Sequence, residues 1–272
     1  MEAEQYQRFC DLLEKRSGIL LGVDKRYLVE TRLSRVLRDQ KIESIDALMG
    51  RLLNGREPAL IKAVIEAMTT NETLWFRDEY PFAALRDVFF PEAVAKKKQN
   101  LRIWSAACSS GQEPYSISML VSEVKPPFSV EIIGTDLSSR VLEQANSGIF
   151  DELSLGRGLS AARKQQFFDV VDHGWKIKPE VRRRVRFQVG NLLDPPVGLG
   201  RFDIVFCRNV LIYFSRETKA QIIEHIANSL QPWGVLILGA SESTQQLSDR
   251  FTVERLPGGG MAFRLKSWGT SD

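Results

Sequence analysis

A change of pattern near residue 100 constrains most strongly what this chain can fold into. From Leu101 onward, short runs rich in β-branched and aromatic residues alternate with amphipathic segments of helical period. Such alternation predicts a parallel α/β sheet. We expect helices at about 114–124, 138–146 and 216–230, and strands at LRIWSA, VEIIGTD, VRFQVG, FDIVFC and GVLILGA. The last two β-rich runs, FTVERL and MAFRL joined by PGGG, predict an antiparallel hairpin at the edge of that sheet.

The first 70 residues show helical periodicity alone. Apolar residues recur at three-to-four spacing in EQYQRFCDLLEKRSG, KRYLVETRLSRVLRDQ, SIDALMGRLL and EPALIKAVIEAMTT. Glycines are expected between these helices or at their ends, at Gly18, Gly22, Gly50 and Gly55. We therefore expect a small all-α domain over 1–70, a linker and helix that cover the site over 71–100, and an α/β domain over 101–272.

Composition narrows the class of protein. The 272 residues are 43% hydrophobic, which is enough for a sizeable core. The beginning, MEAEQYQRF, is polar and acidic, and the most apolar run, WGVLILGA, is too short to span a bilayer, so we expect a cytoplasmic protein without membrane insertion. Its three cysteines lie far apart and its two histidines have no neighbouring ligand cluster, so we expect no disulfide framework, metal site or His-based triad. A net charge of +3 does not by itself argue for nucleic acid as a partner.

The stretch LRIWSAACSSGQEPYSIS predicts a strand, a turn and a helix that begins at about Pro114. Ligands of open parallel sheets bind beyond the carboxyl ends of the strands. A dinucleotide fingerprint would supply three glycines, whereas CSSGQEP has one and adds Glu113, which favours a cationic ligand over a pyrophosphate. Asp136 ends the next predicted strand, where an acid can accept hydrogen bonds from ribose hydroxyls. Either acid alone is more typical of a helix cap, but together they favour a positively charged nucleoside, S-adenosylmethionine.

Five motifs then occur in one order at compatible spacing: NETLWFR, WSAACSSGQEPYSI, GTDLS, GNLLD and FDIVFCRNVLIYF. They resemble the CheR-type chemotaxis receptor methyltransferases over nearly the whole chain. The resemblance implies a class I methyltransferase (Rossmann-like) fold with S-adenosylmethionine as donor, S-adenosylhomocysteine as product and no metal. It also implies a bacterial protein-glutamate O-methyltransferase of chemotactic signal transduction. Its acceptors would be glutamates in the cytoplasmic helical bundle of chemoreceptors, with the enzyme, expected as a monomer, recruited to membrane-bound receptor arrays.

The resemblance also assigns residues. Tyr213 and Arg77 are the expected catalytic residues, with Tyr213 beside the transferred methyl. The planar guanidinium of Arg77 suits a carboxylate such as that of the methionine moiety, and the alternative is a surface ion pair with Asp78 or Glu79. Cofactor contacts are implied for Asn71, Thr73, Arg77, Glu113, Asp136, Asn191, Leu192, Arg208 and Asn209.

For some of these positions an ordinary structural role competes with the functional one. Asn191 and Asn209 follow predicted strand ends, where an asparagine either reads an adenine edge or makes a turn. Trp75 and Phe76 either cover the adenosine or pack at a domain junction. Tyr213 would otherwise be a core tyrosine with a satisfied hydroxyl.

The proposed acceptor explains why no catalytic base is visible in the sequence. A glutamate side chain has a reference pKa of about 4.3, so at neutral pH it is already a nucleophile. The protein then has to align the reacting groups and exclude water. Two rivals remain: a nucleic-acid methyltransferase, although RNVLIYF lacks the prolines of the Asn-Pro-Pro-Tyr loop, and an inactive module that only senses S-adenosylmethionine.

Basic residues mark candidate docking surfaces. Arg32, Arg35 and Arg38 recur on a side of the second helix opposite its apolar residues, which predicts either a solvated face or a surface that docks an acidic receptor helix. The run VRRRVRF precedes a strand and is also consistent with protection of a sheet edge. Many family members carry a small β insert that grips the receptor tail, and residues about 153–185, with HGWKIKP as a short hairpin, occupy that region.

Overall fold

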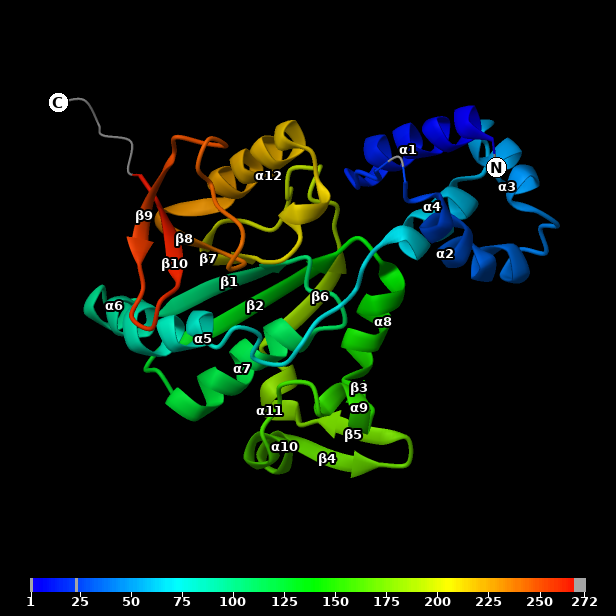
Figure 1. Cartoon of the computed structure of the whole chain (residues 1–272). Coiled ribbons are helices and arrows are strands. Elements are labelled where there is room, and N and C mark those ends of the chain that lie inside the picture. Colours follow the sequence, from blue (N-terminus) through cyan, green and yellow to red (C-terminus); the bar gives the residue numbers. More distant parts are fainter. Residues whose placement is uncertain (1, 23, 267–272) are drawn as a thin grey trace. The chain divides into compact units, whose positions relative to one another are not determined.

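The computed structural model describes residues 2–22 and 24–266. The chain forms two compact units (Figure 1). Met1–Thr70 and the short segment Tyr213–Thr218 make the helical unit, and Asn71–Ile212 with Lys219–Asp272 make the sheet unit. Among the helices of the described residues, none has both the length and the apolar character needed to cross a bilayer.

The helical unit is built from amphipathic helices: α1 (Ala3–Ser17), α2 (Arg26–Asp39), α3 (Ile45–Leu53) and α4 (Pro58–Met68). Their apolar faces form one core, which includes Phe9, Leu33 and Leu48. Gly18 ends α1 in a left-handed conformation at φ 77°, whereas Gly50 lies inside α3 and not at its end as predicted. The segment after β7 adds to this unit, because Leu20 N–H donates to the Tyr213 carbonyl at 2.9 Å and Ile19 forms a β-bridge with Phe214.

The main sheet of the sheet unit has the order β6-β2-β1-β7-β8-β10-β9. Its first five members run parallel, and β10 runs antiparallel to both β8 and β9, which confirms the predicted terminal hairpin. Chain order reverses beside β1, so the topological switch point lies between β1 and β7. The strands are β1 (Asn100–Ala106), β2 (Ser129–Asp136), β6 (Val185–Val189), β7 (Phe202–Cys207), β8 (Leu230–Leu238), β9 (Phe251–Arg255) and β10 (Met261–Leu265).

Helices cover both faces of this sheet, with α12 over one face and α5 to α7 across the other (Figure 1). Alternate strand residues such as Ile103, Ile204 and Ile237 join one core with α7, as the two-residue period of a strand requires. α7 begins at Gln112, two residues before the predicted start. The helices are α5 (Tyr80–Ala84), the π-helical η1 (Leu85–Phe89), α6 (Phe90–Ala95), α7 (Gln112–Val124), α8 (Ser139–Ser147), the short 3-10 turn η2 (Leu211–Tyr213) and α12 (Arg216–Ser229).

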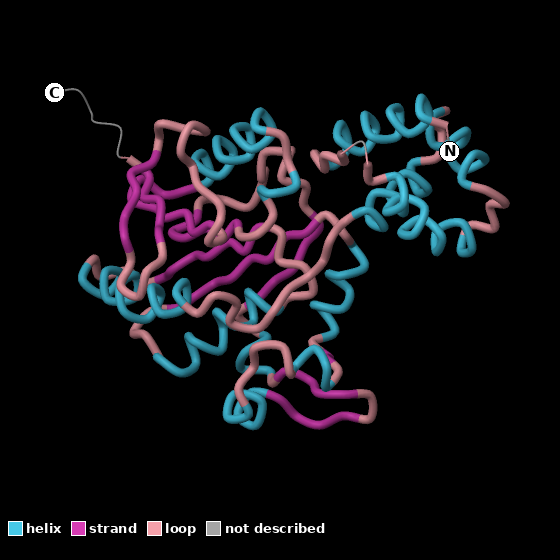
Figure 2. Tube along the Cα trace, in the orientation of Figure 1, coloured by secondary structure: helices cyan, strands magenta, loops and turns pink. Residues whose placement is uncertain are grey.

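A second, small sheet interrupts the chain between α8 and β6 (Figure 2). Its order is β3-β5-β4, with β3 (Ile149–Phe150), β4 (Phe168–Val171) and β5 (Gly174–Ile177), and the short helices α9 (Glu152–Leu155), α10 (Ala161–Phe167) and α11 (Pro179–Arg182) flank it. The run HGWKIKP supplies only β5, not a whole hairpin. Since Val171 pairs with Gly174, the turn is Asp172–His173 and the other strand precedes it.

Candidate active site

The loop after β1 is shaped by left-handed backbone. Ala107 and Ser109 have φ of 65° and 50°, which is uncommon for residues other than glycine and marks a conformation that the surroundings impose. Gly111 has φ 92°, and a Cβ there would lie 3.0 Å from both Ala145 Cβ and Phe187 Cζ. The one glycine of CSSGQEP is therefore required both by conformation and by the close approach of α8 and β6.

Asp136 lies at the carboxyl end of β2 and is 7% exposed. Its Oδ2 accepts the Ser109 N–H at 2.8 Å and its Oδ1 accepts the Ser138 N–H at 3.0 Å. A carboxylate offers about four lone-pair sites, and these two bonds fix its orientation. Ser109 Oγ in turn donates to the Asn71 carbonyl at 2.8 Å, which brings Asn71 to the same loop.

Arg208 joins three chain segments at the switch point. Its Nη1 lies 2.8 Å from Glu113 Oε2, and its Nη2 donates at 2.7 Å to Asp78 Oδ2 and to the Arg77 carbonyl. Burial opposes the charge of Arg208, whose side chain is 2% exposed, but attraction to Glu113 outweighs it and the pKa of Arg208 is raised. Glu113 also accepts the Ser105 hydroxyl at 2.7 Å. The sequence suggested that Glu113 is available to a cationic ligand. In the structure its charge is instead balanced by the internal cation Arg208.

The same network bears on Arg77, for which the sequence left open a surface ion pair with Asp78 or Glu79. Asp78 pairs with Arg208, and no carboxylate of the described residues forms an ion pair with the Arg77 guanidinium, so the alternative pair with Asp78 or Glu79 is wrong. Phe76, Asp78 and Glu79 all have positive φ, as in the loop after β1. Thr73, earlier in this segment, is half-buried.

Glu242, which the sequence analysis missed, anchors the loops after β7 and β8. It is 7% exposed, and its Oε2 accepts the N–H groups of Asn209 at 2.7 Å and Gly239 at 2.8 Å. Its Oε1 accepts the Leu211 N–H at 2.8 Å. Asn209 is held at φ 57° in this arrangement. The only signal in the sequence is an acid shortly after the GVLILGA strand, which pairs with the strand that precedes Arg208 and Asn209.

The remaining predicted residues have mixed outcomes. Asn191 follows β6, and its Oδ1 accepts the Leu193 N–H at 3.1 Å, so it does make a turn. The carbonyl of the neighbouring Leu192 lies 3.4 Å from His225 Nδ1. Tyr213 belongs to the helical unit, so it is not among the residues that the sheet unit brings together.

Trp75 and Phe76 are core residues of the sheet unit, 1% and 6% exposed. Trp75 packs edge-on against Phe150 at 4.9 Å and Phe168 at 5.5 Å between ring centroids, and its Nε1–H donates to the Ser154 carbonyl at 3.1 Å. These partners belong to the β insert. The indole of Trp75 thus packs the insert onto the sheet unit and is too buried to cover an adenosine.

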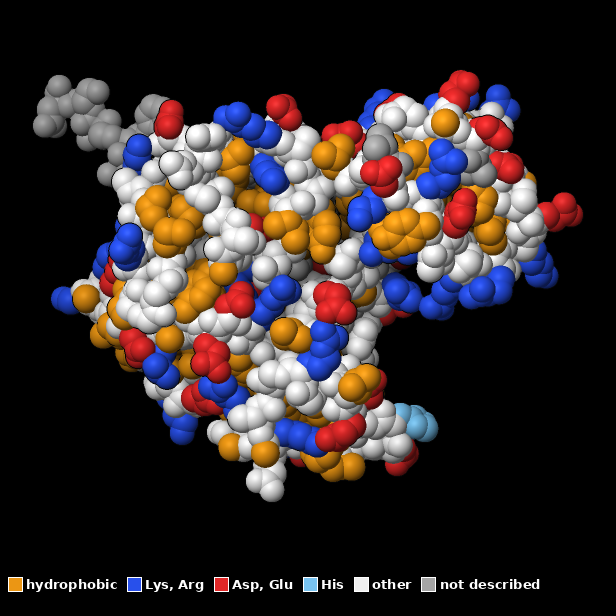
Figure 3. Space-filling model, viewed as in Figure 1, with side chains coloured by type: hydrophobic (Ala, Val, Ile, Leu, Met, Phe, Trp, Pro, Cys, Tyr) orange, Lys and Arg blue, Asp and Glu red, His pale blue; other side chains and the backbone are white. Residues whose placement is uncertain are grey.

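The basic face of α2 is smaller than its sequence suggested. Arg32 donates to the Met68 carbonyl at 2.5 Å and to Thr70 Oγ1 at 2.9 Å, so its guanidinium caps the end of α4. Arg35 pairs with Asp39 at 3.3 Å on the surface, and Arg38 is exposed. Figure 3 shows basic side chains gathered on the face of the helical unit that carries α2.

The donors and acceptors of the sheet unit fit a charged nucleoside. Asp136 places a buried carboxylate at the end of β2, and Arg208 Nε is a buried donor with no partner among the described residues. In the described part of the chain, no group of three or more His, Cys, Asp and Glu side chains could hold a metal ion.

Comparison with known proteins agrees with this geometry. The family described as "CheR methyltransferase, SAM binding domain" matches residues 71–258, and "CheR methyltransferase, all-alpha domain" matches residues 4–69. A "Chemotaxis protein methyltransferase" of Vibrio parahaemolyticus is 48% identical over 269 residues, which cover 97% of each chain. "Chemotaxis protein methyltransferase 1" of Pseudomonas aeruginosa is 47% identical, covering 96% of this chain and 97% of that one.

A more distant relative, the "Chemotaxis protein methyltransferase" of Salmonella typhimurium, is 33% identical and covers 91% of this chain and 86% of its own. Because the S-adenosylmethionine-binding and all-α matches together span most of the sequence, and the relatives align over nearly their full lengths, the chain belongs to the CheR methyltransferase family.

Proposed function

We propose that this S-adenosylmethionine-dependent methyltransferase of chemotaxis esterifies glutamate side chains in the cytoplasmic helical bundle of chemoreceptors. The observation that carries the proposal is that the carboxylates near the carboxyl ends of the strands are already engaged. Asp136 and Glu242 accept backbone N–H groups, and Glu113 is paired with Arg208. None of them is a free general base, which favours an acceptor that is ionised before it binds.

The buried thiols support the same conclusion. Burial raises the pKa of Cys108 and Cys207 well above the ordinary value, so both remain protonated at neutral pH and cannot act as bases. Burial likewise raises the pKa of the Tyr80 hydroxyl, which donates to the Leu238 carbonyl at 2.7 Å. A glutamate acceptor, with a reference pKa of about 4.3, needs no such group.

We propose that the bound cofactor supplies an electrophilic methyl group on a sulfonium. The acceptor carboxylate forms the new O–CH₃ bond as the C–S bond breaks, and no proton is transferred. Asp136 would hold the ribose hydroxyls, while Arg77, whose guanidinium makes no ion pair with a described carboxylate, would hold the methionine carboxylate. Tyr213 would line the path of the methyl group. The contribution of the protein is then alignment and exclusion of water.

We further propose that residues 1–70 dock the receptor, that 71–100 cover the site and that 101–272 bind the cofactor. Receptor helices with several methylatable glutamates are acidic, and the exposed cations of α2 would attract them. Arg35 and Arg38 are the candidates for direct contact, since Arg32 is engaged inside the unit. The enzyme would thus act, as a monomer, at membrane-bound receptor arrays.

The product of the reaction tests the proposed acceptor. The protein is incubated with methyl-labelled donor and either receptor-rich membranes or total nucleic acid, and the labelled fraction is treated with alkali. We expect label in the receptor, released by alkali as methanol, because a methyl ester hydrolyses while methylated bases, lysine and arginine do not. Alkali-stable label, or label in nucleic acid alone, would refute the proposed function.

A further inference from the structure

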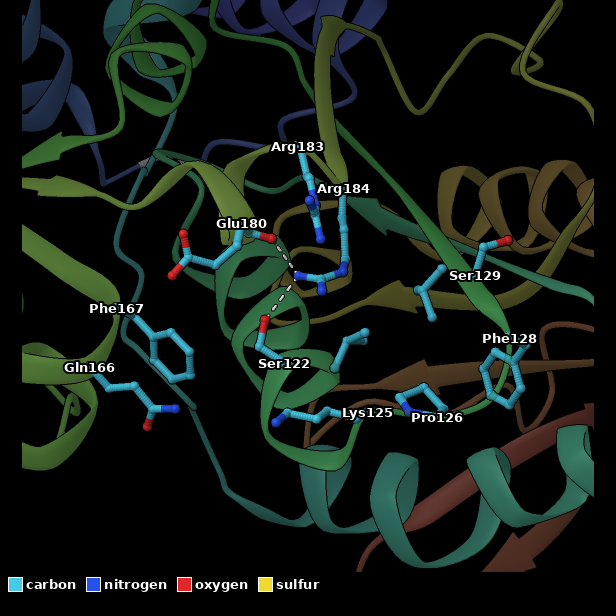
Figure 4. A pocket seen from close by; sticks show the side chains of 12 residues that line it. Ser122, Lys125, Pro126, Phe128, Ser129, Gln166, Phe167, Glu180, Arg183 and Arg184 are labelled. Atoms are coloured by element: carbon cyan, nitrogen blue, oxygen red, sulfur yellow. Dashed lines mark hydrogen bonds between the residues drawn. The ribbon is translucent and has the colours of Figure 1, made fainter.

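A cationic pocket lies in the sheet unit at the amino end of β2, away from the strand ends that carry Asp136. It has a volume of about 740 Å³ and is formed by the end of α7, the start of β2, the end of α10 and the residues around α11 (Figure 4). β2 has eight residues, which at about 3.3 Å per residue separates its two ends by roughly 23 Å. The pocket is therefore distinct from the cofactor site.

The pocket gathers more positive than negative charge, and Glu180 offsets the charge of Arg184 only in part. Lys125, Arg183 and Arg184 line it, and Glu180 is the one acid among the described lining residues. No described carboxylate forms an ion pair with any of these three cations. Arg184 Nη1 donates only to neutral acceptors, Ser122 Oγ at 2.9 Å and the Glu180 carbonyl at 2.5 Å, with a long contact to Ser118 Oγ at 3.5 Å.

Arg183 and Arg184 are neighbours in the chain, and their like charges repel each other. Burial, with a contribution from neighbouring Arg183, lowers the pKa of Arg184. Such an arrangement costs free energy in the empty protein, and a bound anion would relieve that cost. The run VRRRVRF, interpreted from the sequence as protection of a sheet edge, thus places two of its arginines in a concave site.

The size and lining of the pocket indicate the class of ligand. Small-molecule sites commonly enclose about 300 to 1,000 Å³ and combine apolar walls with a few polar groups. Pro126 and Phe128 provide apolar wall here, and guanidinium forks match the oxygens of phosphate in bidentate geometry. We propose that this pocket binds a phosphate-bearing small molecule, with the phosphate held by Arg183, Arg184 and Lys125. The inference does not depend on which acceptor the enzyme methylates.

Calorimetry on the full chain tests the site. The protein is saturated with S-adenosylhomocysteine and titrated with inorganic pyrophosphate or with uridine diphosphate, so that the cofactor site cannot take up either probe. Arg183→Gln and Lys125→Gln should each weaken binding about tenfold, the loss expected for one charge-assisted hydrogen bond. The Arg183 backbone N–H donates to the Pro179 carbonyl at 3.0 Å, a bond that glutamine keeps, and its side chain makes no hydrogen bond with the described residues, so its replacement should leave folding intact.

Arg255→Gln is the matched control, because Arg255 is exposed on β9 and its replacement removes the same charge far from the pocket. Tighter binding of uridine diphosphate than of pyrophosphate would identify an organic phosphate as the ligand, and equal binding would identify phosphate alone. Absence of binding by both probes would overturn the proposal, as would an equal loss in Arg255→Gln. The same titration of the cofactor-free protein is the comparison, and binding seen there but not in the saturated protein would also overturn the proposal.

Discussion

Replacing Glu242 should loosen the end of the sheet that carries Asn209. The carboxylate is buried and accepts the N–H groups of Asn209, Leu211 and Gly239. In Glu242→Ala these donors lose their acceptor. A buried donor left unsatisfied costs about 1–3 kcal/mol, and two of the three bonds are fully buried, so we expect a loss of about 3 kcal/mol or more.

Glu242→Gln separates the hydrogen bonds from the packing. One amide oxygen can still serve Asn209 and Gly239, as Oε2 does, but the amide NH₂ would then face the Leu211 N–H. We therefore expect this variant to lose about 1–3 kcal/mol, less than Glu242→Ala. Glu143→Ala, which removes an exposed acid of α8, should change stability by no more than about 0.5 kcal/mol.

Hydrogen exchange gives the sharpest readout, because it reports the local opening of the affected amides. The Leu211 and Gly239 amides should exchange faster in Glu242→Ala, the midpoint of urea unfolding of the sheet unit should fall, and affinity for S-adenosylhomocysteine should decrease. Glu242→Ala with the same midpoint and the same exchange rates as Glu143→Ala would refute the proposed anchoring.

Further predictions concern the cofactor, the receptor and pH. Asp136→Ala should weaken S-adenosylhomocysteine binding by about 2 to 4 kcal/mol. It should also lower the free energy of unfolding, because the Ser109 and Ser138 N–H groups lose their acceptor. Unchanged affinity of a folded variant, measured by calorimetry, would remove Asp136 from the site. Replacing both Arg35 and Arg38 with alanine should lower receptor methylation without changing cofactor affinity. The activity of the wild-type protein should fall as the salt concentration rises. Full activity of the double variant at every salt concentration would leave this face without a docking role. Single-turnover methylation should show no ionisation between about pH 6.5 and 8.5, and a steep dependence would reveal an overlooked base. Burial raises the pKa of the cysteine thiols above their unfolded values, so the folded chain should resist thiol reagents at pH 8. The free energy of unfolding should be fully retained below the unfolded pKa of these thiols and should fall as pH rises above about 9. Rapid labelling of the thiols without unfolding would contradict this.

The fold was accessible from the sequence because its patterns are local. Val29, Leu33 and Val36 recur at helical spacing and are buried on one face of α2, and the β-rich runs appear as strands of the main sheet. The errors lie where a local pattern is ambiguous. Gly50 was expected at a helix end because glycine is a common terminator, yet α3 continues through it.

Side-chain partners were harder to predict, since they depend on residues distant in sequence. Glu113 and Arg208 are 95 positions apart, and nothing in either motif indicates that one neutralises the other. Arg32 and Met68 are 36 positions apart, and the bond between them removes Arg32 from the exposed stripe. Glu242 has no motif of its own, because its role is to accept backbone N–H groups, which any sequence supplies.

The assignment of Tyr213–Thr218 to the helical unit bears on how the chain folds as it is synthesised. Residues 1–70 leave the ribosome first, but Phe214, which forms a bridge with Ile19 and is 8% exposed, is made only after β7 is complete. The helical unit is thus completed only after β7 has been made, contrary to the usual order in which an N-terminal domain folds as it emerges. A fragment that begins at Asn71 would carry Phe214 without its cover, so cutting the chain at the apparent boundary would leave an apolar segment exposed.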